Sequence, residues 1–398
     1  MTTETSVGVE EAVTQRIVDH LLKRTKDVES ADLEVPVDHF VSPTRLATEI
    51  ALMKRLPLVV AHRSELPAPG DFVTRTVLGT SLIITRRSDG SVAVYRNMCR
   101  HRGGQVEVAA SGNSPTFVCK YHGWAYHRDD GALKHVPQPE VFGSVDPACR
   151  ALKSCSCAER HGLIFVTLTP DAAIPIEDYL GPEVEAQIAP WELERSVIVQ
   201  EQTFPLAANW KLIVDGTVDS LHPPYLHAET VAKLVYAQVA VFSRYGRHGR
   251  LYQPRRRLQT RLEAGDVPPS STKYLSSILM IYPNSLLASA PDHVEFWSVW
   301  PSLEHPGHSN IHIRFYARPE ILTPEMRARI QRSWDILIPV QLTEDWPMEV
   351  TIQQNAAADP AGSFMFGRGE ISAQHLHRQL KEDIDGIPYC STTSTVAR

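Results

Sequence analysis

Two short runs of the sequence place a cysteine and a histidine close together, Cys99-x-His101 and Cys119-x-x-His122, with 17 residues between His101 and Cys119. The chain has only 6 cysteines against 17 histidines, so this pairing is distinctive. Two thiolates and two imidazoles can bind zinc, or a [2Fe–2S] cluster with two Cys on one iron and two His on the other. The spacing favours the cluster, because each loop supplies one Cys and one His. A zinc knuckle would usually present Cys-x₂₋₄-Cys.

A second group of candidate ligands follows the pattern Asp219-x-x-His222-x₄-His227. Residues three apart share one face of a helix, which would join Asp219 to His222. Residues five apart do not, but Pro223 and Pro224 interrupt a regular helix directly after His222. A kink or a π-like turn is therefore expected to bring both imidazoles to one centre. Two histidines and one carboxylate form the facial triad of non-haem Fe(II) oxygenases, which leaves coordination positions open.

Both motifs resemble those of the catalytic α subunits of Rieske non-haem iron oxygenases, and the resemblance extends from about residue 40 to 385. The clearest matches are Arg-Asn-x-Cys-Arg-His-Arg-Gly, which begins at residue 96, and Cys-x-Tyr-His-Gly-Trp, which begins at residue 119. The resemblance implies that a [2Fe–2S] Rieske cluster is bound by Cys99, His101, Cys119 and His122. It also implies a mononuclear Fe(II) held by three residues, His222, His227 and a distant carboxylate. Asp345 is the best candidate for that carboxylate, and its neighbour Glu344 is the alternative.

The same resemblance assigns Asp219 a catalytic role. Its carboxylate would hydrogen-bond His122 or His101 of a neighbouring subunit and so link the two metal centres for electron transfer. This link implies an oligomer, expected to be a homotrimer with or without β subunits. One departure from the family pattern lies nearby, because Asp215 stands where many ring-hydroxylating members carry an asparagine.

The implied activity is that of an oxygenase component. O2 and electrons passed from the cluster to the iron would hydroxylate an aromatic or other small organic substrate, as in aromatic hydrocarbon catabolism. Oxidative O- or N-demethylation is the alternative, and a zinc-dependent hydrolase or an electron-transfer protein is less favoured. The chain has no Gly-x-Gly-x-x-Gly fingerprint, so a separate reductase, with or without a ferredoxin, is expected to take electrons from NAD(P)H.

The hydrophobic pattern sets out the elements that must position these residues. Val13, Ile17 and Leu21 repeat at helical spacing, whereas short apolar runs divided by turn signals dominate from residue 57 to 168. Later segments mix strand-like and helical patterns. The resulting prediction is an α+β fold with three parts: an N-terminal helical segment (1–56) packing on the catalytic domain, an all-β Rieske domain (57–168), and a catalytic mononuclear iron domain (169–398) with an antiparallel sheet flanked by helices.

The substrate pocket is predicted only by position. It is expected among the sheet and helices after residue 206, and its candidate residues are Leu212, Val218, Met280, Tyr282, Asn284, His293, Phe296 and Trp297. Because Phe296 and Trp297 are adjacent on a predicted strand, at most one of them should face the pocket.

Composition limits the remaining function classes. The chain has 398 residues and a formal net charge of −6, which gives no general electrostatic affinity for nucleic acid. No secretory signal is recognisable, and no apolar stretch approaches the roughly 20 residues of a membrane-spanning helix. We therefore expect a cytoplasmic protein without a nucleic-acid or membrane partner.

Overall fold

The computed structural model describes residues 2–169, 175–266 and 274–386, and for residues 2–10 it describes the backbone alone. The chain divides into two compact units. The first unit contains Met1–Leu52, Gln200–Phe315 and Thr323–Arg398, and the second contains Met53–Val199 and Tyr316–Leu322. The α+β fold class predicted from the sequence is confirmed.

The second unit is built on two β-sheets. A seven-stranded sheet has the order β2-β11-β10-β5-β4-β3-β6, and a three-stranded sheet has the order β7-β8-β9. The strands are β2 (Leu58–His62), β3 (Asp71–Val77), β4 (Thr80–Arg86), β5 (Val92–Arg96), β6 (Ser111–Asn113), β7 (Thr116–Val118), β8 (Ala125–His127), β9 (Leu133–His135), β10 (Ser154–Arg160) and β11 (Leu163–Thr167). The sequence did not predict helix α4 (Ile176–Ile188), whose Pro182 follows a kink at Gly181, where φ is 72°.

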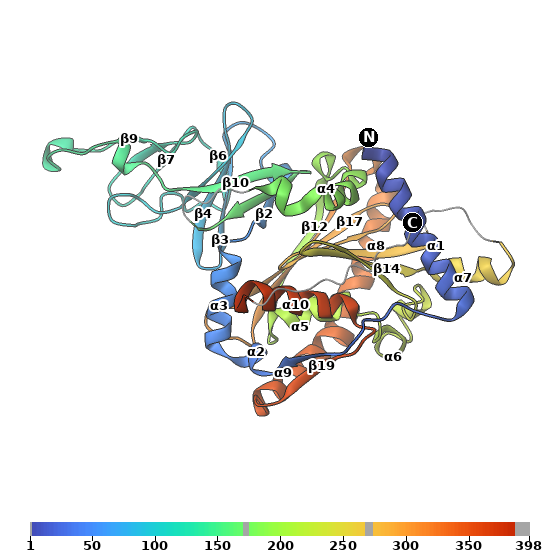
Figure 1. The fold of residues 1–398 in the computed structure, drawn as a ribbon. Coiled ribbons are helices and arrows are strands. Elements are labelled where there is room, and N and C mark those ends of the chain that lie inside the picture. The colour runs from blue at the N-terminus through green and yellow to red at the C-terminus, as the bar shows by residue number, and fades with distance from the viewer. Residues whose placement is uncertain (1, 170–174, 267–273, 387–398) are drawn as a thin grey trace. The chain divides into compact units, whose positions relative to one another are not determined.

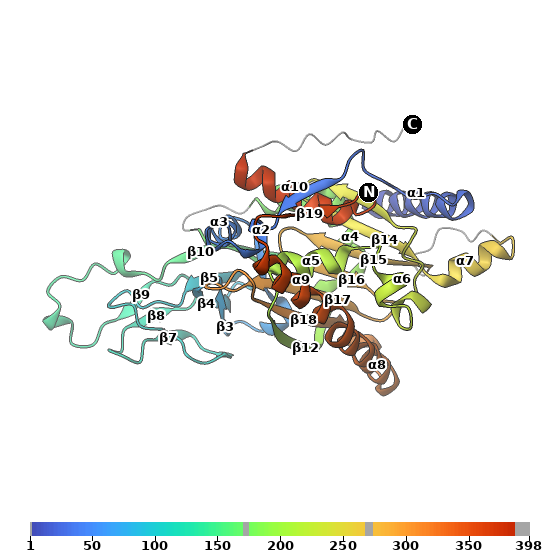
Figure 2. The ribbon, with the colours of Figure 1, turned by 90° about the horizontal axis from the view of Figure 1, so that it is seen from below.

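The first unit is centred on a seven-stranded sheet of order β12-β18-β17-β16-β15-β14-β13 (Figures 1 and 2). Its strands are β12 (Val197–Leu206), β13 (Val241–Tyr245), β14 (His248–Pro254), β15 (Leu275–Ile281), β16 (Ser285–Ser289), β17 (Val294–Pro301) and β18 (Ser309–Ala317). Neighbouring strands from β13 to β17 pair antiparallel. Two further strands far apart in sequence, β1 (Leu33–Pro36) and β19 (Ser363–Phe366), pair with each other.

The helices of the first unit pack around this sheet. They are α1 (Thr2–Lys23), α2 (Asp38–Val41), α3 (Pro43–Met53), α5 (Trp210–Val218), α6 (Pro223–Leu226), α7 (Arg256–Glu263), α8 (Pro324–Val340), α9 (Trp346–Ala358) and α10 (Ile371–Asp385). Helix α5 contacts β17, α9 and α10 (Figure 1), so it lies within the core. None of the helices in the described part of the chain combines the length and the apolar character needed to cross a bilayer.

The predicted N-terminal stripe is largely buried. Val13, Ile17 and Val18 pack with Val241 and Tyr252 of β13 and β14. The buried face of α1 therefore packs on the β13–β14 edge of the central sheet.

A buried ion pair fixes helix α5 to helix α3. The Lys211 ammonium lies 2.8 Å from both carboxylate oxygens of Glu49, and Trp210 Nε1 donates to the same carboxylate at 2.8 Å. Both ends of the pair are almost fully buried. Burial alone would raise the pKa of Glu49, but the Lys211 ammonium beside it holds that pKa below its usual value. The pair anchors the helix that leads directly into the candidate site.

Candidate metal centres

Helix α5 ends shortly before the first candidate histidine. Its last residue is Val218, and Asp219 already has an extended backbone with φ −75° and ψ 138°. The Asp219 carboxylate accepts hydrogen bonds from the backbone N–H groups of Leu221 (2.8 Å) and His222 (3.1 Å). It therefore caps the turn that precedes α6, since aspartate side chains commonly accept from backbone N–H groups a few residues ahead, whereas the N-cap residue of α6 itself is His222. The sequence analysis had joined Asp219 to His222 across a helix face, whereas the structure joins them through this cap.

The capping carboxylate also orients the first imidazole. Asp219 Oδ2 accepts from His222 Nδ1 at 2.8 Å. His227 follows at the end of α6, and its Nδ1 donates to Glu344 Oε2 at 2.5 Å. Thr230 donates to the same Glu344 oxygen at 2.8 Å. Each imidazole thus has its Nδ1 held by a carboxylate, which leaves Nε2 as its available donor atom.

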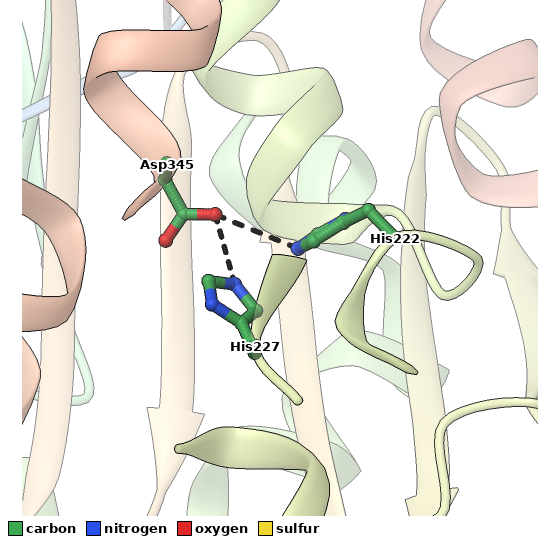
Figure 3. Close-up of side chains that lie close together, drawn as sticks. All are labelled: His222, His227 and Asp345. Atoms are coloured by element: carbon green, nitrogen blue, oxygen red, sulfur yellow. Dashed lines mark ion pairs between the residues drawn. The ribbon is translucent and has the colours of Figure 1, made fainter. Parts of the chain in front are cut away.

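The third candidate, Asp345, lies at the end of a π-helical turn between α8 and α9, η9 (Gln341–Asp345). Its Oδ1 lies 2.9 Å from His227 Nε2 and 3.5 Å from His222 Nε2 (Figure 3). Gln341 donates to the other oxygen, Oδ2, at 2.6 Å. One donor atom from each of His222, His227 and Asp345 lies within 4.8 Å of the others. The structure therefore brings these three residues together, while Glu344 contacts the far side of His227.

The surrounding charges favour a cation at this point. Burial raises the pKa of Glu349 well above its ordinary value, and Asp345 and Asp215 raise it further. Burial would lower the pKa of His227, but the carboxylates of Asp345 and Glu344 raise it overall. Two imidazole nitrogens and one carboxylate oxygen, each supported by a further hydrogen bond, form a donor set that fits a divalent transition metal.

Among the described residues, no hydrogen bond links Asp215 to His222, His227 or Asp345. Asp215 Oδ2 instead accepts from His377 Nε2 of α10 at 2.8 Å, and both side chains are buried. Burial raises the pKa of Asp215, whereas His377 opposes that rise. His377 was not identified from the sequence, because 162 residues separate it from Asp215.

The second candidate centre consists of two loops with matching hydrogen bonds. Gly104 accepts from Cys99 N at 2.7 Å, and Trp124 accepts from Cys119 N at 2.9 Å. Gly103 and Gly123 donate back to the two cysteine carbonyls at 3.0 and 2.9 Å, both with positive φ. Positive φ is accessible to glycine without steric cost, so these loops can turn tightly.

The loops place their two histidines side by side and their two cysteines side by side. Nδ1 of His101 lies 3.2 Å from Nδ1 of His122. The two cysteines are buried beside each other, and burial raises the pKa of the Cys119 thiol, with Cys99 as a hydrogen-bonding neighbour. Tyr126 Oη lies 3.2 Å from Cys99 Sγ and accepts from the Arg100 backbone N–H at 2.9 Å. A pair of neighbouring thiols and a pair of neighbouring imidazoles form the donor set that a Rieske [2Fe–2S] cluster requires.

A cavity of about 1100 Å³ extends from the His222, His227 and Asp345 group. Of the eight pocket residues expected from the sequence, it is lined by His293 and Trp297, while the others are not part of its wall. Trp297 faces the cavity and its neighbour Phe296 does not, in keeping with strand alternation. A cluster of basic residues on this wall, Arg255, Arg256 and Arg257, was not predicted from the sequence.

Comparison with known proteins gives two family matches. The family described as "Ring hydroxylating alpha subunit (catalytic domain)" matches residues 186–386, and the "Rieske [2Fe-2S] domain" matches residues 57–151. The second match implies a [2Fe–2S] cluster, and the first implies a mononuclear iron.

Curated relatives align over part of the chain. The large subunit of anthranilate 1,2-dioxygenase from Acinetobacter baylyi is 31% identical over 209 residues, 50% of this chain and 44% of the relative. The large oxygenase component of the naphthalene 1,2-dioxygenase system from Pseudomonas putida is 33% identical over 44% of this chain and 40% of the relative. The glycine betaine monooxygenase oxygenase subunit from Chromohalobacter salexigens is 28% identical over 51% of this chain and 45% of the relative. The match thus spans less than half the length of these relatives.

Solved structures share the fold over most of the chain. The quaternary ammonium Rieske monooxygenase CntA in complex with L-carnitine has a TM-score of 0.73 at 19% identity, covering 90% of this chain and 96% of that chain. Naphthalene 1,2-dioxygenase with bound indole has a TM-score of 0.67 at 21% identity, covering 89% of this chain and 95% of that chain.

Proposed function

Because the chain belongs to the family of ring-hydroxylating α subunits and carries a Rieske domain, we propose that it is the oxygenase component of a Rieske non-haem iron oxygenase. In this proposal it uses O2 and electrons to hydroxylate an aromatic or other small organic substrate. The observation that carries the proposal is the convergence of His222 Nε2, His227 Nε2 and Asp345 Oδ1 on one point.

The chain's own residues have distinct tasks in this function. Cys99, His101, Cys119 and His122 hold the cluster, and His222, His227 and Asp345 hold the iron. When bound, the cluster supplies single electrons and the Fe(II) supplies the centre at which dioxygen is activated. Three protein ligands leave coordination positions free, and the cavity beside them gives the substrate access.

Asp219 is proposed to link the two centres. Its carboxylate holds His222 Nδ1 and is only partly buried. In a homotrimer, with or without β subunits, it would also accept a hydrogen bond from His122 or His101 of the partner subunit. A separate reductase, with or without a ferredoxin, would return electrons to the cluster from NAD(P)H.

Oxidative N-demethylation is the alternative reaction, because the relatives include enzymes whose names specify glycine betaine and quaternary ammonium compounds. This reaction would use the same protein residues. It would differ from ring hydroxylation only in the substrate group that lies beside the iron.

The first test is spectroscopic and functional. We expect the purified protein to be red-brown, with an electron-spin signature of a reduced Rieske cluster, and to consume O2 with a surrogate reductase and substrate. A colourless protein that contains only zinc would overturn the proposal.

Asp219→Ala tests the link between the centres. We expect both iron centres to be retained, measured as iron content and cluster spectrum, while coupled product formation is lost. Asp219→Asn serves as a second variant, because its amide oxygen can still accept the backbone N–H bonds of the turn that precedes α6. Full activity of both variants would contradict the proposed bridge.

A further inference from the structure

One corner of the cavity wall carries three consecutive arginines, Arg255, Arg256 and Arg257, at the end of β14 and the start of α7. Figures 1 and 2 both show α7 beside α6, the helix that lies between the two candidate iron histidines. The lining of the cavity includes both the arginine corner and His222, His227 and Asp345.

No carboxylate in the described parts of the chain lies within ion-pair distance of these three guanidinium groups. Arg255 Nε donates to the Leu275 carbonyl at 3.0 Å. Arg256 Nε donates to the Ala232 carbonyl at 2.9 Å, and its guanidinium lies 4.9 Å from the centre of the Tyr236 ring. These contacts orient the side chains without neutralising them.

The other basic residues of the same wall have acidic partners. Lys233 pairs with Glu229 at 2.6 Å, and Arg329 pairs with Asp292 at 2.6 Å. Arg261, one turn further along α7, pairs with Asp266. Among the described basic side chains of this wall, only Arg255, Arg256 and Arg257 thus have no ion-pair partner, and Glu295 of the same wall acts on Arg255 from a greater distance.

Arg255 is the most enclosed of the three. Burial lowers the pKa of Arg255, and the charge of Arg257 lowers it further, although Glu295 opposes the shift. An arginine stays charged in proteins, and burial removes part of the water that stabilises that charge. A bound anion would therefore offset the desolvation cost of the half-buried Arg255 guanidinium.

The backbone fixes this corner to the loop that leaves the metal site. Arg255 forms an isolated β-bridge with Val235, and Arg256 N donates to the Leu234 carbonyl at 2.9 Å. Val235 follows His227 by eight residues, so an extended chain could separate them by at most about 29 Å. The 3₁₀ turn at Val231–Lys233 shortens that path.

Apolar side chains line the cavity alongside these two polar ends. They include Val231, Leu234, Ile278, Leu286, Trp297 and Val340. The cavity thus combines apolar walls with one basic corner.

We propose that the arginine corner binds the carboxylate of the substrate, so that the substrate is an organic acid with an aromatic or otherwise apolar body. This inference rests on the proposed function, because it identifies the substrate class of that same site. A guanidinium presents paired N–H donors that match the two oxygens of a carboxylate. A quaternary ammonium group would instead meet like charge there, so the corner disfavours cationic substrates.

The test uses three ligands with one body and different charges: 2-naphthoate, 2-naphthamide and 2-naphthyltrimethylammonium. Their dissociation constants are measured on the intact holoenzyme by calorimetry, without reductase, so that no turnover is needed. We expect naphthoate to bind at least tenfold more tightly than the amide and the ammonium compound to bind most weakly. Equal or tighter binding of the amide or the ammonium compound would overturn the inference.

Single substitutions then locate the carboxylate. Arg255→Gln should reduce the preference for naphthoate over naphthamide about 10- to 100-fold, as expected for a lost charge-assisted contact. Arg257→Gln, at an exposed position where folding is not at risk, should reduce it by a smaller factor.

Arg261→Gln is the matched control, because it removes the same charge from the same helix but its guanidinium already has an acidic partner. It should leave the preference unchanged. An equal loss in the Arg255, Arg257 and Arg261 variants would indicate a general charge effect and overturn the assignment. The binding measurements test the carboxylate subsite, whereas O2 consumption tests the proposed oxygenase function. Either one of these two proposals can therefore be refuted without the other.

Discussion

Replacing Glu344 by glutamine is expected to weaken metal binding at the His222, His227 and Asp345 site while the fold is preserved. Glu344 does not converge with the three donor atoms, but its Oε2 accepts from His227 Nδ1 at 2.5 Å and from Thr230 at 2.8 Å. Glutamine retains the shape and one acceptor oxygen, but it loses the negative charge that keeps His227 in the tautomer with a free Nε2.

The expected size of the effect follows from these two contacts. A hydrogen bond to a charged group contributes about 1.5–3 kcal/mol, and a neutral one about 1 kcal/mol. Neutralising Glu344 therefore removes roughly 0.5–2 kcal/mol from the bond that orients His227. Removal of such orienting partners typically lowers metal affinity about 10- to 100-fold. We expect Glu344→Gln toward the lower end and Glu344→Ala, which removes both bonds, toward the upper end.

The assay is a competition titration of metal-free protein with Fe(II) or Co(II) against a chelator of known affinity. Glu229→Gln is the control, because it removes one negative charge from an exposed position only two residues from His227. Asp345→Asn should lower affinity at least tenfold more than Glu344→Gln. An unchanged affinity in Glu344→Gln would refute the positioning role. A loss equal to that of Asp345→Asn would mean that Glu344 is itself a ligand.

Three further predictions concern stability and redox properties. Lys211→Met should cost about 3–5 kcal/mol in denaturant unfolding, because Glu49 stays buried without its main partner; Lys211→Met with Glu49→Leu should recover most of it. Burial lowers the pKa of His375 to about 4, so stability should be complete above pH 6.5 and fall by roughly 3 kcal/mol as the pH drops toward 4. His375→Asn should flatten that part of the stability profile. Tyr126→Phe should lower the cluster's reduction potential by about 40 mV in a redox titration, since about 1 kcal/mol of hydrogen bonding to Cys99 is lost.

Each of these has a result that would contradict it. A Lys211→Met loss below about 1 kcal/mol would mean that Arg45 and Trp210 alone support Glu49. Identical pH profiles for the wild-type protein and the His375 variant would exclude His375 as the source of the acid sensitivity. An unchanged potential in Tyr126→Phe would mean that the hydroxyl does not donate to the sulfur.

The sequence allowed prediction of features whose residues lie close together along the chain. Cys-x-His and Cys-x-x-His each occupy one loop, so residue type and spacing are sufficient to identify them. The strand-rich region from 57 to 168 and the α+β class follow similarly from local hydrophobic period, and the fold class is confirmed.

Features that depend on distant segments could not be predicted. Asp215 and His377 lie 162 residues apart, so no local sequence pattern indicates their contact. Alternation limited the pocket to one of Phe296 and Trp297, but only the packing of the sheet decides which of them faces the cavity. The arginine corner could not be predicted for the same reason. Its three arginines indicate an anion site only when the ion-pair partners of the neighbouring basic residues are known, and those partners are identified from the fold.

The spacing of Asp219, His222 and His227 now has a physical explanation that differs from the helical one. His222 lies three positions after Asp219 because a carboxylate that accepts from the backbone two and three residues ahead can also reach the imidazole there. Four residues separate the two histidines because one proline-initiated turn, α6, lies between them. The pattern therefore encodes a cap and a turn, and both act on Nδ1 or on the backbone. Both Nε2 atoms face Asp345 because Asp219 holds Nδ1 of His222 and the distant Glu344 holds Nδ1 of His227. Metal binding therefore requires little rearrangement of the two histidines.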